Sequence, residues 1–206
     1  MEKNTKPTSV SLLIIDESGS MSGMNSFVLE TFLGIRNEME AEKTEFPELT
    51  QHLNVWTFEG NKIEERLPFI EVNADTIKTI DFRPGGNTPL FDALGKALNR
   101  LKDKLASLGL NKENCRVGVA VITDGEENSS RLYSGTEIQI LVEQLAQEGW
   151  EFTYYGTDHD VKQMAERLAI GRHRSFSKNA TGFDELRRVQ IAEEKSAKYG
   201  FLKRFK

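Results

Sequence analysis

Oxygen-bearing side chains are concentrated in three short polar segments, which cover residues 16–20, 85–89 and 123–125. Mg²⁺ is a small, hard cation that takes six oxygen ligands near ~2.1 Å and readily keeps bound waters. Carboxylates and hydroxyls are hard donors of the kind it prefers. These segments therefore contain oxygen donors, two carboxylates and three hydroxyls among them, that could bind such a cation. They are the side chains of Asp16, Ser18, Ser20, Thr88 and Asp124.

The two carboxylates would balance the double charge of the cation, directly or through bound water. The three hydroxyls would add ligands without adding charge, so the ion would stay electrophilic towards an outside donor. A carboxylate from another protein could then take the open coordination position. Taken singly, each segment also suits an ordinary turn or helix cap that binds no metal, since Asp, Ser, Thr and Gly are common there.

Two apolar runs must carry these segments to one place. Residues 10–15 are predicted to form a buried strand that ends at Asp16. Residues 117–122 form the most continuously apolar run, which we expect to be a central strand ending before Asp124. Ligands of open α/β sheets bind outside the carboxyl ends of the strands, which is where these segments lie.

Strands and helices alternate along the rest of the chain. Helices are predicted at 28–39, 90–108, 138–145, 161–168 and 182–198, and further strands at 53–58, 62–70, 152–155 and 173–177. Only residues 59–61 separate two of these strands, so they should form an antiparallel hairpin, and Pro68 suits an edge strand. Thr88 is expected to cap the leucine-rich helix, with Pro89 as its first residue.

This order of elements predicts the fold class. It is α/β, a doubly wound, Rossmann-like and mostly parallel sheet with one antiparallel edge strand and helices on both faces. The sequence shows no internal repeat, low-complexity segment or linker. Residues 1–206 are therefore expected to form a single domain, with a core over about 9–197 and a basic, aromatic tail over 198–206.

The three polar segments together resemble the von Willebrand factor A-type (integrin I-like) domain, and the resemblance extends from about Ser9 to about Ala197. It depends on an Asp-x-Ser-x-Ser motif, on the threonine of Gly-Gly-Asn-Thr-Pro-Leu and on the aspartate of Thr-Asp-Gly. The matching residues are Asp16, Ser18, Ser20, Thr88 and Asp124.

The resemblance implies that these five residues are the ligands of a metal-ion-dependent adhesion site, and that the protein is not an enzyme. The expected cofactor is Mg²⁺, with Mn²⁺ or Ca²⁺ as substitutes, and the expected partner is a protein that offers an Asp or Glu. Short chains of this kind are similar to stand-alone bacterial or phage members of the family.

Enzyme alternatives lack residues that their chemistry needs. A Mg²⁺-dependent phosphohydrolase remains an alternative, but its motif resembles Asp-x-Asp, and Ser18 stands where the second Asp would act as general acid. The hydrolase elbow Gly-x-Ser-x-Gly is not matched, because Met21 occupies the nucleophile position. The Gly-x-Gly-x-x-Gly fingerprint of dinucleotide-binding folds is absent after the first strand.

Two other polar groups near the predicted strand ends have simpler interpretations. Glu126 and Glu127 are expected to be loop charges, and Asp160 is expected to cap the helix that follows it rather than bind a second metal.

Charge is distributed unevenly along the chain. Residues 162–206 carry 12 Lys and Arg against 5 Asp and Glu, while residues 1–161 have a net charge of −12. The basic C-terminal region could bind nucleic acid or an acidic partner, or it could be a solvated last helix. We disfavour nucleic acid, because the acidic remainder of the chain would repel phosphate.

The numbers of cysteines and histidines, and the hydropathy of the chain, exclude further classes of protein. A single cysteine, Cys115, allows no internal disulfide, and together with three histidines it rules out the usual Cys/His zinc site. We see no signal peptide and no apolar run near the ~20 residues of a membrane span. The expected location is therefore the cytoplasm with no membrane partner, and no pattern specifies an oligomeric state.

Overall fold

The computed structural model of the protein describes residues 6–73 and 80–205. Within them the strands are β1 (Thr8–Asp16), β2 (Thr50–Glu59), β3 (Lys62–Glu71), β4 (Cys115–Thr123), β5 (Trp150–Gly156) and β6 (Arg172–Ser175). The α-helices are α1 (Asn25–Glu45), α2 (Leu90–Ser107), α3 (Gly135–Gln147), α4 (Val161–Arg167) and α5 (Ala180–Leu202). Short 3₁₀ helices are η1 (Gly19–Met21) and η2 (Lys203–Phe205).

The strands form one sheet in the order β3-β2-β1-β4-β5-β6. All neighbouring pairs are parallel except β2 and β3, which form the predicted antiparallel hairpin. The turn of this hairpin needs Gly60, whose φ of +46° lies in the left-handed region that favours glycine. The predicted α/β fold class, with one antiparallel edge strand and β4 near the centre, is thus confirmed.

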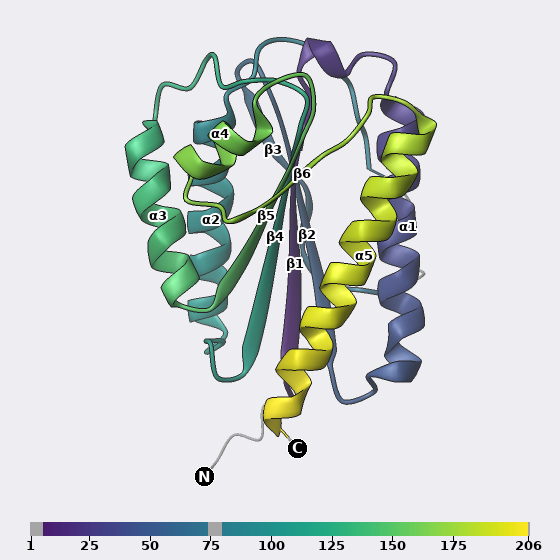
Figure 1. The fold of residues 1–206 in the computed structure, drawn as a ribbon. Helices are drawn as coiled ribbons and strands as arrows, with labels where there is room; N and C mark the ends of the chain where they lie inside the picture. The colour runs from purple at the N-terminus through teal and green to yellow at the C-terminus, as the bar shows by residue number, and fades with distance from the viewer. Residues whose placement is uncertain (1–5, 74–79, 206) are drawn as a thin grey trace.

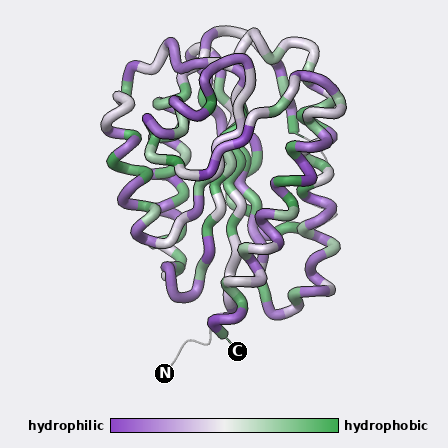
Figure 2. The backbone as a smooth tube through the Cα atoms, viewed as in Figure 1, coloured by the Kyte–Doolittle hydropathy of each residue, from purple (hydrophilic) through white to green (hydrophobic). Residues whose placement is uncertain are grey.

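Helices cover both faces of the sheet (Figure 1). α1 and α5 lie on one face, and α2, α3 and α4 lie on the other. Residues of β1 alternate between the two cores, because successive side chains of a strand point to opposite faces. Leu12 and Ile14 pack towards α2 and α3, whereas Leu13 and Ile15 pack towards α1 and α5. The strands accordingly form the apolar centre of the molecule in Figure 2.

Three expectations about helix ends and faces differ from the structure. The cap of α2 is Pro89 rather than Thr88, so the helix begins at Leu90. Leu108, the last member of the predicted leucine stripe, is 48% exposed because it lies beyond the end of α2. α5 continues past residue 198 to Leu202, because Phe201 and Leu202 pack with Phe46 and Leu49 in a separate apolar cluster.

No helix of the described residues has the length and apolar character needed to cross a membrane.

Charged side chains are buried where α5 meets the sheet and α1. The Lys198 ammonium lies 2.6 Å from the Glu42 carboxylate, and both side chains are at most 2% exposed. Arg116 of β4 pairs with Glu194 of α5 and with Glu151 of β5, at 2.8 Å in both cases. Each of the buried charges in these pairs thus has an opposite partner, which offsets the cost of burying it.

We expect Lys198→Met to destabilise the protein by about 3–5 kcal/mol, because it leaves the Glu42 carboxylate buried without a counter-ion. Urea denaturation at neutral pH measures the change. The matched control is Lys195→Met, three residues away, whose pair with Glu45 is exposed and should contribute far less, because solvent screens exposed ion pairs. Equal losses in the two variants would contradict the expectation, and Lys198→Met combined with Glu42→Leu should recover most of the loss.

Candidate metal centre

Asp16 and Asp124 are brought together by neighbouring parallel strands. β1 pairs with β4, with Ile15 opposite Ile122, so both chains leave the sheet at the same edge. Asp16 is the last residue of β1, and Asp124 directly follows the end of β4. Their exposed fractions are 0% and 2%. The structure therefore places two acidic side chains, 108 positions apart in the sequence, in one buried corner.

The Asp16 carboxylate is held by one hydrogen bond to each oxygen. The Ser18 amide donates to Oδ1 at 2.7 Å, and the Thr123 hydroxyl donates to Oδ2 at 2.6 Å. Each oxygen keeps a further lone pair, because a carboxylate oxygen can accept two bonds. Burial raises the pKa of Asp16 to about 6 against the effect of these bonds, and the charge of Asp124 adds to the increase.

The two serines form a hydrogen-bonded chain that reaches Asp124. The Ser18 and Ser20 hydroxyl oxygens are 3.1 Å apart, and the Ser20 hydroxyl donates to Asp124 Oδ1 at 2.7 Å. This geometry depends on η1, which turns the chain directly after Ser18. Ser18 is buried whereas Ser20 is exposed, so the chain of hydroxyls runs from the interior to the surface.

A glycine-containing loop carries Thr88 to the same corner. The Gly19 amide donates to the Gly86 carbonyl at 3.1 Å, and the Gly85 amide donates to the Glu17 carbonyl at 2.9 Å. Gly86 has a φ of +62°, and a Cβ there would lie only 2.9 Å from the backbone nitrogen of Gly60. Backbone therefore contacts backbone at this point, which leaves no room for a side chain.

Thr88 is buried and faces the serines across Gly125. Its amide donates a hydrogen bond to Asn128 Oδ1 at 2.9 Å. A Cβ built on Gly125 would lie 3.4 Å from the Thr88 hydroxyl and 4.0 Å from that of Ser20, so the two hydroxyls approach this glycine from the same side. The structure thus brings together all five side chains that the sequence analysis selected.

Lys178 also reaches this corner, and sequence analysis missed it as a site residue. Its ammonium lies 2.8 Å from Asp124 Oδ2 and 2.8 Å from Asp158 Oδ2. Burial lowers the pKa of Lys178, but the hydrogen bonds to Asp124 and Asp158 outweigh this effect and raise it. The sequence analysis counted Lys178 in the basic C-terminal region, and no local pattern connects it with an aspartate 54 positions earlier.

Neighbouring acidic residues support loops. Glu17 points away from the five side chains, accepting bonds from Arg66 at 2.9 Å and from the Arg83 amide. Glu127 accepts bonds from the amides of residues 91, 129 and 130 and so holds its own loop against α2.

Asp160 caps α4 through the Gln163 amide at 2.9 Å, as expected. His159 bonds to the Tyr154 hydroxyl and the Thr157 carbonyl.

The donor set fits a hard divalent cation. Adjacent oxygens around an octahedral Mg²⁺ lie about 3.0 Å apart, given metal–oxygen distances near ~2.1 Å. The spacings of 3.1 and 2.7 Å along the chain from Ser18 to Asp124 are close to this value. Within residues 6–73 and 80–205, no three His, Cys, Asp or Glu side chains gather as a metal cluster. A site here would therefore depend on hydroxyl oxygens, which suits Mg²⁺ better than zinc.

The geometry gives little support to the hydrolase alternatives. The Ser20 hydroxyl donates a hydrogen bond to Asp124, and the described residues include no histidine bonded to either serine. Cys115 is buried, which raises its thiol pKa to about 12 and removes it as a nucleophile at neutral pH.

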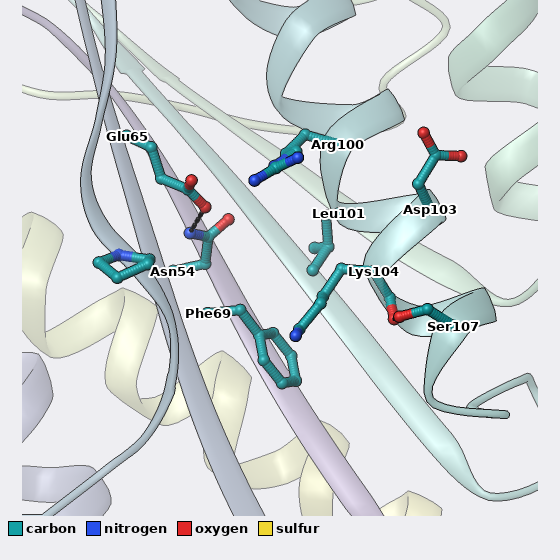
Figure 3. A pocket seen from close by; sticks show the side chains of 9 residues that line it. Asn54, Glu65, Phe69, Arg100, Leu101, Asp103, Lys104 and Ser107 are labelled. Atoms are coloured by element: carbon teal, nitrogen blue, oxygen red, sulfur yellow. Dashed lines mark hydrogen bonds between the residues drawn. The ribbon is translucent and has the colours of Figure 1, made fainter.

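A hollow of about 380 Å³ lies between α2 and the β2–β3 hairpin (Figure 3), and none of the five side chains lines it. Arg100, Lys104 and Glu65 line it, with Phe69 below, so charges of both signs face one open space.

Most basic side chains of the C-terminal region are paired with carboxylates. Ion pairs join the cations at 172, 174, 187 and 195 to acidic neighbours, and Lys198 is buried against Glu42. Lys206 lies outside the described residues. This pairing lowers the positive potential that a phosphate backbone would need.

We expect the metal-free protein to lose stability relative to Asp16→Asn as the pH rises from about 4 to about 6. The ordinary pKa of the carboxyl is 3.8 and its folded value is about 6, so the folded state holds a proton in this window that the unfolded state has released. The full shift corresponds to about 3 kcal/mol. Urea denaturation in chelator across this pH range measures it. Asp103→Asn, at an exposed site in α2, is the control, and parallel pH profiles for wild type and Asp16→Asn would contradict the prediction.

Comparisons with known proteins agree with this architecture. Among solved structures, the chain is similar to the SpRpn10 VWA domain, with a TM-score of 0.57 and 12% identity over 86% of this chain and 93% of that one. The TFIIH p34 N-terminal domain has a TM-score of 0.54 and 12% identity, over 91% of this chain and 98% of that one. The manganese-loaded Plasmodium vivax TRAP protein has a TM-score of 0.54 and 18% identity, over 86% of this chain and 71% of that one. At these identities the similarities establish the fold.

Sequence comparison identifies the family. No significant match is found among curated proteins. The family model of the von Willebrand factor type A domain matches residues 12–192, a span that runs from β1 into α5 and includes all three polar segments. This chain therefore belongs to the von Willebrand factor type A domain family.

Proposed function

We propose that this chain is a protein-interaction module that binds a partner's carboxylate through a Mg²⁺ held at the five-residue site. The family consists of interaction modules that are often metal-dependent. The observation that carries the proposal is the convergence of three separate chain segments on one sheet edge. The side chains involved are Asp16, Ser18, Ser20, Thr88 and Asp124.

Each part of the set has a distinct role in this proposal. The two buried aspartates supply negative charge, and the hydroxyls supply neutral oxygen ligands. A cation bound in this way keeps enough positive charge to attract a further carboxylate oxygen. Because Ser20 is exposed while Asp16 is fully buried, the ligand set is open on one side, where a partner's Asp or Glu could approach.

Manganese is a reasonable substitute for magnesium, since both ions take octahedral oxygen ligation. The similar TRAP protein is described as manganese-loaded. We extend this to the present chain as part of the proposal, with Ca²⁺ as a further substitute.

Titration calorimetry with the chelator-stripped full chain tests the metal site. We expect one site for Mg²⁺ and for Mn²⁺, lost in Asp16→Ala and weakened at least tenfold in Thr88→Ala, because each variant removes an oxygen ligand. Asp103→Ala removes an exposed acidic group from α2 and should bind as wild type does. Retention of wild-type affinity by Asp16→Ala would contradict the proposed ligand set.

Peptide selection tests the partner chemistry. A random peptide library panned on the immobilised chain in Mg²⁺ should enrich peptides that contain Asp or Glu. The same selection in chelator, or on Asp16→Ala, should show no enrichment. Acidic peptides enriched equally in chelator would argue for a metal-independent surface instead.

A further inference from the structure

Lys178 makes an unusual contact for a surface lysine, because its ammonium reaches a carboxylate that is fully buried. The Asp124 side chain is 0% exposed and the Lys178 side chain is 24% exposed, with 2.8 Å between Nζ and Oδ2. The same ammonium also lies 3.5 Å from the Ser20 carbonyl. Lys178 therefore enters the site from the solvent side and covers the oxygen of Asp124 that Ser20 does not use.

Asp158 holds Lys178 in this position from outside. Its carboxylate lies 2.8 Å from the ammonium and is 57% exposed. Asp158 has a φ of +61°, a left-handed conformation that Asp and Asn tolerate better than most residues. The ammonium is thus placed between a buried and an exposed carboxylate, with both bonds short.

We propose that Lys178 is a built-in competitor for the metal, a tethered cation that neutralises Asp124 and must leave it before a divalent ion binds. This inference rests on the proposed metal site. An ammonium and a divalent cation a few ångströms apart repel each other strongly, and Lys178 is bonded to the same carboxylate, Asp124, that the metal would use. Lys178 therefore sets the metal concentration at which the site fills.

Metal affinity in Lys178→Met gives the first test. Methionine keeps an unbranched chain of similar length without the charge. We expect Mg²⁺ and Mn²⁺ to bind Lys178→Met at least about tenfold more tightly than wild type by calorimetry. Lys203→Met removes the same charge from η2, next to the C-terminus, which Figure 1 places at the end of the sheet away from the loops after β1 and β4, and it should leave the affinity within about twofold.

Amine labelling of the wild-type chain gives a second, independent measurement. If Lys178 leaves Asp124 when metal binds, saturating Mg²⁺ should speed modification of its amine several-fold, as measured by peptide mass mapping. Lys203 serves as the internal reference, and Asp16→Ala should abolish the Mg²⁺ effect.

The outcomes separate this inference from the proposed function. Tighter binding by Lys178→Met, or binding by that variant alone, supports the competition. Equal or weaker binding by Lys178→Met, or labelling that Mg²⁺ leaves unchanged, overturns it while the metal site stands. Absence of metal binding in both proteins overturns the proposed function and this inference with it.

Discussion

The burial of two like charges at one sheet edge is the constraint on which the rest of this site depends. Asp16 and Asp124 are almost inaccessible to water, and burial, with a smaller contribution from the charge of Asp124, raises the Asp16 pKa to about 6 although its hydrogen bonds lower it. An ionised carboxylate in such a place needs donors or counter-ions, or it becomes protonated. The Ser18 amide and the hydroxyls of Thr123 and Ser20 supply the donors. Hydrogen bonds cannot cancel the net charge, however, so the corner favours a cation.

The loops around the site are arranged by contacts that have no direct part in binding. Glu17 directs its carboxylate away from the site to Arg66, while its carbonyl accepts the Gly85 amide. Gly86 contacts both the loop after β1, through Gly19, and the turn of the hairpin, at Gly60. These contacts fix the position of Thr88 two residues later. Glu127 binds the first turn of α2 and the loop after β4 together. These contacts hold the oxygens of the proposed metal site in place, which would lower the entropic cost of binding an ion there.

Sequence patterns predicted what depends on local order, and missed what depends on long-range placement. The buried runs of β1 and β4 indicated parallel central strands, and from these the meeting of Asp16 and Asp124 followed. The short link at residues 59–61 likewise predicted the hairpin. The prediction that Thr88 caps α2 was wrong, because the Thr88 side chain lies next to Gly125 and does not cap the helix. Lys178 could not be recognised, since its position depends on how the segment between β6 and α5 crosses the sheet edge.

The charges of the whole cluster argue for a divalent rather than a monovalent ion. Asp16, Asp124 and Asp158 each contribute one negative charge when ionised, and Lys178 contributes one positive charge, so the four groups have a net charge of −2. One Mg²⁺ makes the cluster neutral, whereas a monovalent ion leaves it with a net charge of −1. Because Asp158 is exposed and Asp124 is buried, an ammonium that moves outwards stays paired with Asp158. The charge balance is therefore met with the divalent ion inside and the lysine outside, an arrangement that keeps both cations next to carboxylates.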